Sequence, residues 1–339
     1  MVLRKTVERG ILPMTLSLPD KWIWDSWYVR SGDLWHAFFL QAPNTLAHPD
    51  MRHFNVSVGH ATSTDLKDWT HLGTCLEPVP GPAWNDFTTW TGSVVRGDDG
   101  LWHLFYTASA REEEGLYQRI GHATSENLHD WTRIDDEPTL DLTGPNAEHY
   151  EADHMVGVWH DRAMRDPWVM RDPKGGWLMV FTARAPGIEE PNAGGAIGLA
   201  TSPDLMGWTL EPPAFTGGYG QLEVPQIFEH GGTWYCLFCT SAEHFSKAQA
   251  EATAGGPVTG THYLMSDEGP RGPWRIAPGF LDGALPPRRY AARIVDAEDG
   301  LAIMGFADRP EGRFEGYVMD PDRVVRNADG TLEVVPWDR

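Results

Sequence analysis

Short runs of alternating hydrophobic and polar residues, each ended by a glycine- or aspartate-rich turn, follow one another along this chain. One run, a glycine turn followed by an aromatic and β-branched stretch, occurs five times. Its copies are "GDLWHAFFLQA" (32–42), "DGLWHLFYTAS" (99–109), "GGWLMVFTAR" (175–184), "GGTWYCLFCTS" (231–241) and "DGLAIMGFAD" (299–308). These patterns are typical of β-strands, and helical periodicity is almost absent. The chain is therefore expected to be all-β.

A second repeat follows the first and sets the size of the repeating unit. Its copies are "VGHATSTDLKDWTHL" (58–72), "IGHATSENLHDWTRI" (120–134), "IGLATSPDLMGWTLE" (197–211) and a degenerate "HYLMSDEGPRGPWRI" (262–276). Each copy reads as a strand, a polar turn and a second strand that opens on tryptophan. The first three copies are spaced by 62 and 77 residues, which is too long for one hairpin and suits a four-stranded blade.

Five such units fill the chain and predict a five-bladed β-propeller, each blade a four-stranded antiparallel sheet, as one domain over residues 1–339. A β-sandwich with accidental similarity is the alternative, but three near-copies of one motif are hard to obtain by chance. Residues 14–18 and 316–325 are expected to pair and close the ring, which removes an exposed sheet edge. The longest insert, 143–163, is expected to shape one rim of the axial pocket.

Composition says more about the possible binding partners than about the reaction. The 339 residues carry a formal net charge of −21 and include 16 tryptophans and three cysteines. Clustered Lys and Arg, which phosphates attract, are missing, so nucleic acid and anionic membranes are not expected as partners. No apolar run approaches the ~20 residues of a membrane span. The first residues lack a signal-peptide core, and the unpaired cysteines suit a reducing cytoplasm.

Three acidic residues share one position of the repeat. Counted back from the tryptophan of each aromatic strand, Asp25 lies ten residues away, and Asp166 and Glu223 lie eleven. Because the first strand of each propeller blade lines the central channel, we expect the three carboxylates to converge there. The equivalent positions in the other two units are Thr91–Gly92 and Tyr290.

Each acid alone also has a purely structural interpretation. Asp166 precedes a proline, which is common in turns, and Asp25 would be a hydrogen-bonded core residue. Asp25 lies among three tryptophans in "KWIWDSWYVR" (21–30), where an ionised carboxylate is costly unless it is paired or faces a wet cavity. The shared register of the three acids favours a functional explanation instead, in which the aromatic rings wall a pocket that contains the carboxylates.

Convergent carboxylates in an aromatic pocket suit the cleavage of glycosidic bonds. One acid protonates the leaving oxygen, while another attacks the anomeric carbon or activates water. Aromatic faces bind the apolar faces of sugars. Mutual repulsion of the carboxylates is also expected to raise the pKa of one of them, which keeps the general acid protonated near neutral pH.

At these residues the sequence resembles the β-fructosidase clan of glycoside hydrolases, which comprises family 32 (invertases, inulinases, levanases) and family 68 (levansucrases). The matching segments are "WDSW" (24–27, the levansucrase form), "FFLQAP" (38–43), "GHATSTDLKDW" (59–69), "WTGSVV" (90–95), "RDPWV" (165–169), "EVP" (223–225) and "LDGALPPRRYAARI" (281–294). The resemblance spans about residues 22–308 and implies a five-bladed propeller. The C-terminal β-sandwich usual in family 32 is not expected within these 339 residues.

The resemblance also implies a role for each matching residue. Asp25 would be the nucleophile that forms a covalent fructosyl-enzyme, and Glu223 the general acid and then the general base. Asp166, assisted by Arg165, would hold two sugar hydroxyls and stabilise the transition state. The fructose subsite would be lined by Trp24, Gln41, Trp90 and Ser93, with Arg289 and Tyr290 from the fifth blade. Retention would need the carboxyls of Asp25 and Glu223 about 5–5.5 Å apart.

Three other functions fit the same pattern. An arabinanase or xylosidase of the family 43 type also uses two Asp and one Glu but inverts, which needs a carboxylate gap of about 6.5–9.5 Å. A β-mannoside phosphorylase would need basic residues near the acids, for which Arg165, Arg288 and Arg289 are candidates. A carbohydrate-binding propeller would have no catalysis at all. Sequence does not choose between hydrolysis and transfer.

No cofactor is expected, and the partner is a small sugar substrate. The insert holds a group of acidic and histidine side chains without known metal-ligand spacing, which favours a solvated loop: Glu148, His149, Glu151, Asp153, His154 and His160. A structural Ca²⁺ on Asp-rich turns leaves little sequence signature and stays compatible with the chain.

Overall fold

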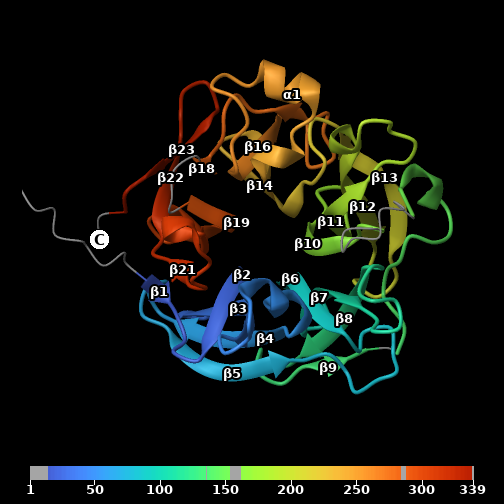
Figure 1. Ribbon diagram of the computed structural model, residues 1–339, viewed down its shortest axis with the longest axis vertical. Helices are drawn as coiled ribbons and strands as arrows, with labels where there is room; N and C mark the ends of the chain where they lie inside the picture. Colours follow the sequence, from blue (N-terminus) through green and yellow to red (C-terminus); the bar gives the residue numbers. More distant parts are fainter. Residues whose placement is uncertain (1–13, 135, 153–161, 284–287, 338–339) are drawn as a thin grey trace, which may run out of the picture.

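Five antiparallel sheets surround a common axis. The computed structural model describes residues 14–134, 136–152, 162–283 and 288–337. Figure 1 looks along the axis and shows β2, β6, β10, β14 and β19 as the strands nearest to it. The predicted five-bladed β-propeller is therefore confirmed.

Three blades have four strands each, taken in sequence order from the axis outward. The first holds β2 (Lys21–Ser31), β3 (Leu34–Pro43), β4 (Ser57–Ser63) and β5 (Thr70–Leu76). The second holds β6 (Thr88–Arg96), β7 (Trp102–Ser109), β8 (Arg119–Ser125) and β9 (Thr132–Arg133). The third holds β10 (Arg165–Arg171), β11 (Trp177–Arg184), β12 (Gly195–Ser202) and β13 (Thr209–Thr216).

The other two blades keep four strand positions but divide some of them. The fourth holds β14 (Glu223–His230), β15 (Thr233–Thr240) and β16 (Gly260–Ser266), with β17 (Arg275–Ile276) and β18 (Asp282–Gly283) both paired to β16. The fifth holds β19 (Arg288–Ala297), β20 (Gly300–Asp308), β21 (Val318–Met319), β22 (Asp322–Arg326), β23 (Leu332–Val335) and β1 (Met14–Leu16). Leu16 pairs with Val318, so the predicted closure of the ring by the two ends of the chain is confirmed.

The hydrophobic core is divided among the contacts between neighbouring blades. Five clusters of buried side chains occur among the described residues, and each joins residues of adjacent blades. Phe105 of β7, for example, packs in one cluster with Phe181 of β11. Each such fully buried side chain stabilises the fold by roughly 1.5–3 kcal/mol, so the ring is held together blade by blade.

The outer repeat builds the same turn in three blades. Asp65, Asn127 and Asp204 each accept backbone N–H bonds from the residues two and three positions later. The next residue is a buried leucine in the left-handed region, with φ of 64° at Leu66, 69° at Leu128 and 72° at Leu205. The polar side chain accepts hydrogen bonds from the backbone N–H groups of the turn, and the leucine side chain fills the core behind it.

The inner strands carry a different repeated feature. Each has one more residue than the partner strand opposite, which is a β-bulge and re-aims the nearby side chains. The bulges lie between Ile23 and Ser26, Trp90 and Gly92, Arg165 and Trp168, Glu223 and Gln226, and Tyr290 and Arg293. The three predicted acids all lie at these positions.

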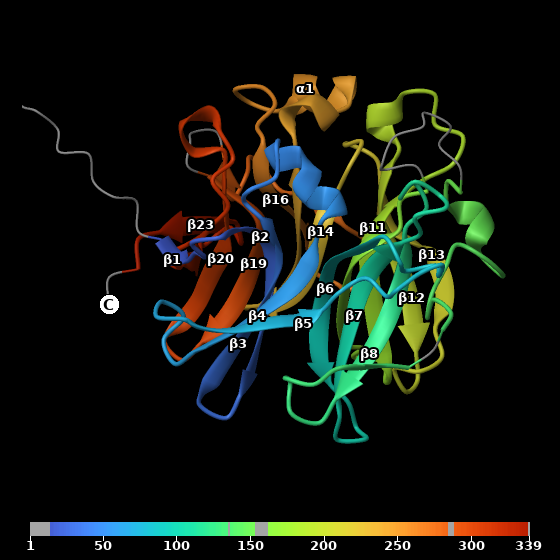
Figure 2. The ribbon, with the colours of Figure 1, turned by 60° about the horizontal axis from the view of Figure 1, so that its bottom comes forward.

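Short helical segments cap one end of the ring. Figure 2 shows the 3-10 helix η1 (Pro49–Phe54) and the helix α1 (Lys247–Ala252) on the same side of the molecule. In the described part of the chain, no helix has the length and apolar character needed to cross a bilayer. The three cysteines are free thiols; Cys236 and Cys239 are buried and Cys75 is partly so.

Candidate active site

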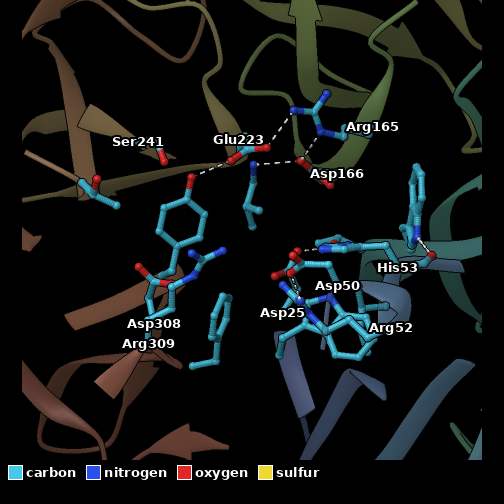
Figure 3. Close-up of a pocket in the computed structure, with 18 of the residues that line it drawn as sticks. Asp25, Asp50, Arg52, His53, Arg165, Asp166, Glu223, Ser241, Asp308 and Arg309 are labelled. Carbon is cyan, nitrogen blue, oxygen red and sulfur yellow. Dashed lines mark hydrogen bonds and ion pairs between the residues drawn. The ribbon is translucent and has the colours of Figure 1, made fainter. Parts of the chain in front are cut away.

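A cavity of about 800 Å³ opens on the axis, and all three predicted acids line it. Asp25 comes from β2, Asp166 from β10 and Glu223 from β14, so three blades contribute one carboxyl each. Figure 3 shows their side chains pointing toward one another across the pocket. Carboxylates that lie far apart in the sequence are thus brought to one wet cavity, as the repeat position predicts.

Three of the bulges hold a residue in an unusual backbone conformation, and in the β19 bulge it is Ala291, with φ of 48°. Asp166 has φ of 59°, and Val224, directly after Glu223, has φ of 53°. The left-handed region is unfavourable for a β-branched residue such as valine and is found mainly where the surrounding structure enforces it. The N–H of Val224 donates to Oδ2 of Asp166 at 3.0 Å. This bond fixes the β10 and β14 bulges, and therefore their acids, relative to each other.

Asp25 is an acid with a strongly raised pKa. Burial raises its pKa, and the nearby Asp166 carboxylate raises it further, to about 7. The Thr91 hydroxyl opposes this by donating to Oδ2 of Asp25 at 2.5 Å. Thr91 lies on β6 at the position equivalent to Asp25, so the second blade contributes a hydrogen bond where the first contributes an acid.

Asp166 is held by Thr182 and Arg165 in addition to the N–H of Val224. Thr182 donates its hydroxyl to Oδ2 at 3.0 Å, and Nε of Arg165 lies 3.5 Å from the same oxygen. The pKa of Asp166 is raised, because burial outweighs the attraction of the Arg165 guanidinium.

Glu223 has the opposite protonation behaviour. Burial favours its neutral form, but Arg165 at 2.9 Å from Oε1 and the Tyr290 hydroxyl at 2.6 Å from Oε2 outweigh burial and lower its pKa. Burial, aided by repulsion between the carboxylates, therefore keeps a proton among the three acids near neutral pH. The pKa is thus raised at Asp25 and lowered at Glu223, a direction opposite to the one expected for the general acid.

Four of the seven predicted sugar-binding residues line the pocket: Trp24, Trp90, Arg165 and Tyr290. Gln41, Ser93 and Arg289 do not. Gln41 is fully buried and donates to Thr74 at 2.8 Å, and Ser93 accepts the N–H of Val169.

Arg289 is turned away from the cavity, although the next residue, Tyr290, lines it. Its guanidinium pairs with Asp282 at 2.9 Å and with Asp322 at 2.6 Å, and it also donates to the Asp320 carbonyl at 2.6 Å. Successive residues of a strand point to opposite sides, so only one of the two could face the axis. Arg289 therefore joins β22 of its own blade to β18 of the fourth blade.

The segment η1 forms a part of the pocket that sequence reasoning missed. Arg52 pairs with Asp50 at 3.1 Å and lies with its guanidinium 5.5 Å from the Trp24 ring. Trp90 donates its indole N–H to the His53 carbonyl at 2.8 Å, and Phe54, 37% exposed, forms the lip. The signal for this segment was the long stretch between the first two repeat strands, with a proline that starts the helix.

The insert 143–163 does not line the pocket in its described part. Tyr150 is buried against the third blade, where its hydroxyl donates to the Glu211 carbonyl at 2.6 Å, and Glu151 pairs with Arg184 at 3.2 Å. The predicted role at the rim is wrong for these residues, and Asp153, His154 and His160 lie outside the described ones. Across the ranges that the structure describes, no group of three metal-binding side chains is found.

Comparison with known proteins gives the family context. The family described as "Glycosyl hydrolases family 32 N-terminal domain" matches residues 19–266. A sucrose-6-phosphate hydrolase of Escherichia coli is 27% identical over 233 residues, which are 66% of this chain and 42% of that protein. A levanase of Bacillus sp. (strain L7) is 27% identical over 275 residues, 75% of this chain and 26% of that protein. The chain thus spans less than half the length of these relatives.

Solved structures show a similar fold over almost the whole chain. An inulosucrase from Halalkalicoccus jeotgali, bound to kestose, superposes with a TM-score of 0.75 at 20% identity, covering 96% of this chain and 90% of that one. A thermostable family-43 glycoside hydrolase superposes with a TM-score of 0.67 at 13% identity, covering 96% of both chains. At these identities the likeness concerns the fold alone, and it does not separate the two kinds of enzyme.

Proposed function

The chain belongs to family 32 of the glycosyl hydrolases, and on this premise we propose that it is a retaining enzyme that cleaves β-fructofuranosides through a covalent fructosyl-enzyme. The observation that carries the proposal is the convergence of Asp25, Asp166 and Glu223 on one cavity walled by Trp24 and Trp90. Sucrose, fructo-oligosaccharides and levan are the substrates that this chemistry suits.

The first step forms a bond between Asp25 and the sugar. The Asp25 carboxylate attacks the anomeric carbon of the fructosyl unit, and the bond from that carbon to the bridging oxygen breaks. Glu223 gives its proton to the departing oxygen, so the leaving sugar is released as an alcohol. In the second step Glu223 takes a proton from water or from a sugar hydroxyl, which attacks the same carbon and frees Asp25.

The other pocket residues bind rather than react. Asp166 accepts hydrogen bonds from sugar hydroxyls, and Arg165 keeps it and Glu223 in place through the contacts at 3.5 and 2.9 Å. Trp24 and Trp90 offer ring faces to the furanose. The exposed ring of Phe54, stacked on Phe87 with centroids 5.1 Å apart, offers another face to the sugar beyond it.

The protonation of the cluster fits this division of roles. The reactive form has Asp25 ionised and Glu223 protonated, whereas the raised pKa of Asp25, about 7, favours the form with the proton on Asp25. Both forms hold one proton among the same acids, so proton transfer within the cluster converts one into the other. Activity is expected to fall as the pH rises through about 7, because the cluster then loses that proton.

The experiment that tests the proposal is incubation with sucrose, inulin and levan, with chromatographic separation of free fructose from transfer products. Fructose, free or transferred, is expected from at least one of them, and Glu223→Gln should slow its formation by roughly 10²–10⁴-fold. Release of arabinose or xylose from their glycosides, with no fructose from any fructoside, would show a family 43 type of activity instead. Sugar binding without turnover would show a binding propeller.

A further inference from the structure

A buried arginine that the proposed reaction does not use lies directly behind the acids. Arg293 of β19 is 1% exposed and does not line the pocket. Its Nη1 donates to the carbonyls of Val224 at 3.2 Å and Pro225 at 2.6 Å, which are the two residues after Glu223. Its guanidinium lies 5.0 Å from the centre of the Trp168 ring.

The backbone next to Arg293 is also fixed by hydrogen bonds. On the next residue, the Ile294 N–H donates to the Gln226 side chain at 2.6 Å, and the Gln226 amide donates back to the Ile294 carbonyl at 2.8 Å. This pair of bonds joins β19 to β14 next to both bulges. Arg293 is therefore held against the strained backbone at Val224, with φ of 53°, by contacts that do not involve the pocket.

The guanidinium is charged and has few partners of its own. Its Nε and Nη2 find no hydrogen-bond acceptor among the residues that the structure describes. Burial lowers the pKa of Arg293 to about 10, which leaves it protonated at neutral pH. A buried guanidinium that lacks a full set of hydrogen bonds is costly unless negative charge nearby offsets it.

The acids of the pocket supply that negative charge. The ionisable groups that act on Arg293 come from three elements: Asp25 and Tyr28 of β2, Asp166 of β10, and Cys236 and Cys239 of β15. Burial raises the pKa of the Tyr28 hydroxyl well above neutrality, so it stays uncharged. Burial raises the pKa of both thiols far above neutrality, so they stay uncharged. The remaining neighbours in the cluster are Arg165, Glu223 and Tyr290.

Arg52 also lies near Asp25, but its charge is paired with Asp50 at 3.1 Å, so the charges of the acids, Arg165 and Arg293 can be counted by themselves. Three carboxyls with one proton carry two negative charges, and Arg165 supplies one positive charge. We propose that Arg293 supplies the second, as a buried counter-charge that allows Asp25 to ionise while Glu223 keeps its proton. Arg293 is then a positioning residue that acts through Asp25, and this assignment rests on the proposed function.

The test is the pH dependence of kcat/KM with a fructoside that the wild type cleaves. Arg293→Gln removes the charge but keeps a donor for the Val224 and Pro225 carbonyls. Without the positive charge a further proton is retained, so the pH optimum is expected to move upward by roughly one unit. Arg293→Lys keeps the charge and should keep the optimum. An unchanged optimum in folded Arg293→Gln, or an equal shift in both variants, would overturn the proposal.

Arg184→Gln provides the matched control. Arg184 is another buried arginine; it pairs with Glu151 and donates to the carbonyls of Gly220 and Pro191, and it does not line the pocket. Its loss should lower the melting temperature and leave the pH optimum unchanged. A merely structural role of Arg293 would give the same result as this control.

A second measurement does not depend on activity. If Arg293 balances Asp25, adding Asp25→Asn to Arg293→Gln removes one charge of each sign from the cluster. At pH 8 Asp25→Asn should then raise the melting temperature more in the Arg293→Gln background than in the wild type, or restore folding where the single variant does not fold. Additive effects of the two substitutions would contradict the counter-charge. This outcome is separate from the proposed function, which stands or falls on fructose release by the wild type.

Discussion

The inner strands and the outer hairpins are both repeated from blade to blade, but the features that are repeated differ between the two regions. The outer turns repeat side chains as well as backbone, with a buried leucine at φ of 64–72° in three blades. The inner strands repeat only the backbone, with one bulge in each of five strands. At these bulges the blades present different residues: Asp25, Thr91, Asp166, Glu223 and Tyr290.

The difference follows from what each region has to do. An outer turn closes a hairpin and fills the gap to the next blade, so one solution serves all blades. The inner bulges face one cavity, and a reaction that needs an acid, a nucleophile and hydrogen-bond donors needs a different group from each blade. Similar residues in a repeat therefore mark structure here, whereas divergent residues at one repeat position mark the site.

The largest expected effect separates the inner acids from other acids on the same strand. Glu223→Gln should lower kcat/KM for a fructoside by roughly 10²–10⁴-fold, because the leaving oxygen loses its proton donor. Glu229→Gln is the control, since Glu229 lies on β14 but is exposed and caps the following turn through the Gly232 N–H. Steady-state kinetics of both variants, with folding checked by circular dichroism, give the comparison. Equal activities of the two variants would show that Glu223 has no larger role in the reaction than Glu229.

The next effect is on stability and belongs to the outer region. Leu205→Ala should destabilise the protein by about 2–5 kcal/mol, because Leu205 is fully buried in the cluster between the second and third blades. Denaturant unfolding measures the loss. The pH optimum and the activity per folded molecule should match the wild type, and a shifted optimum would show that the outer turns contribute to the site.

The two regions should also respond to pH with opposite sign. The pKa of Asp25 is raised to about 7 in the folded protein, so Asp25 destabilises the fold increasingly as the pH rises toward 7. Asp25→Asn should therefore raise the melting temperature, by an amount that grows with pH and levels off above about 7.

The pKa of Asp204 is lowered in the outer turn by the N–H groups of Met206 and Gly207, so its contribution is present at neutral pH and lost in acid. Asp204→Ala should accordingly lower the melting temperature at pH 7 and have little effect once the carboxyl is protonated. Thermal unfolding of both variants, measured from acidic pH to above pH 7, gives the comparison. A change in melting temperature of the same sign for both variants would contradict the environments assigned to Asp25 and Asp204.

The smallest effect concerns the lip of the pocket. Phe54→Ala should raise KM for a fructo-oligosaccharide by roughly two- to tenfold through loss of a stacking face, with kcat for sucrose nearly unchanged. Phe54→Tyr should restore KM. Phe280→Ala is the matched control, because Phe280 is 39% exposed and does not line the pocket. Loss of kcat with unchanged KM would place Phe54 in another role.

The sequence predicted the ring, its closure and the convergence of the acids because these depend on patterns with a fixed period. It did not predict which neighbours of the acids face the cavity, because a bulge changes the alternation of the strand and has no sequence signal of its own. Ser93 follows such a bulge and hydrogen-bonds to Val169 instead of lining the pocket. Arg293 was missed for the same reason, and η1 because loops carry no period.

The proposal that Asp25 forms the bond to fructose can be tested most directly by trapping that bond. Glu223→Gln is incubated with a fructosyl fluoride, whose leaving group needs no proton, and the protein is digested and analysed by mass spectrometry. We predict a fructosyl unit on the peptide that contains Asp25, and none in the Asp25→Asn, Glu223→Gln double variant. An adduct on a different acid, or a wild-type product of inverted anomeric configuration, would contradict the proposed mechanism.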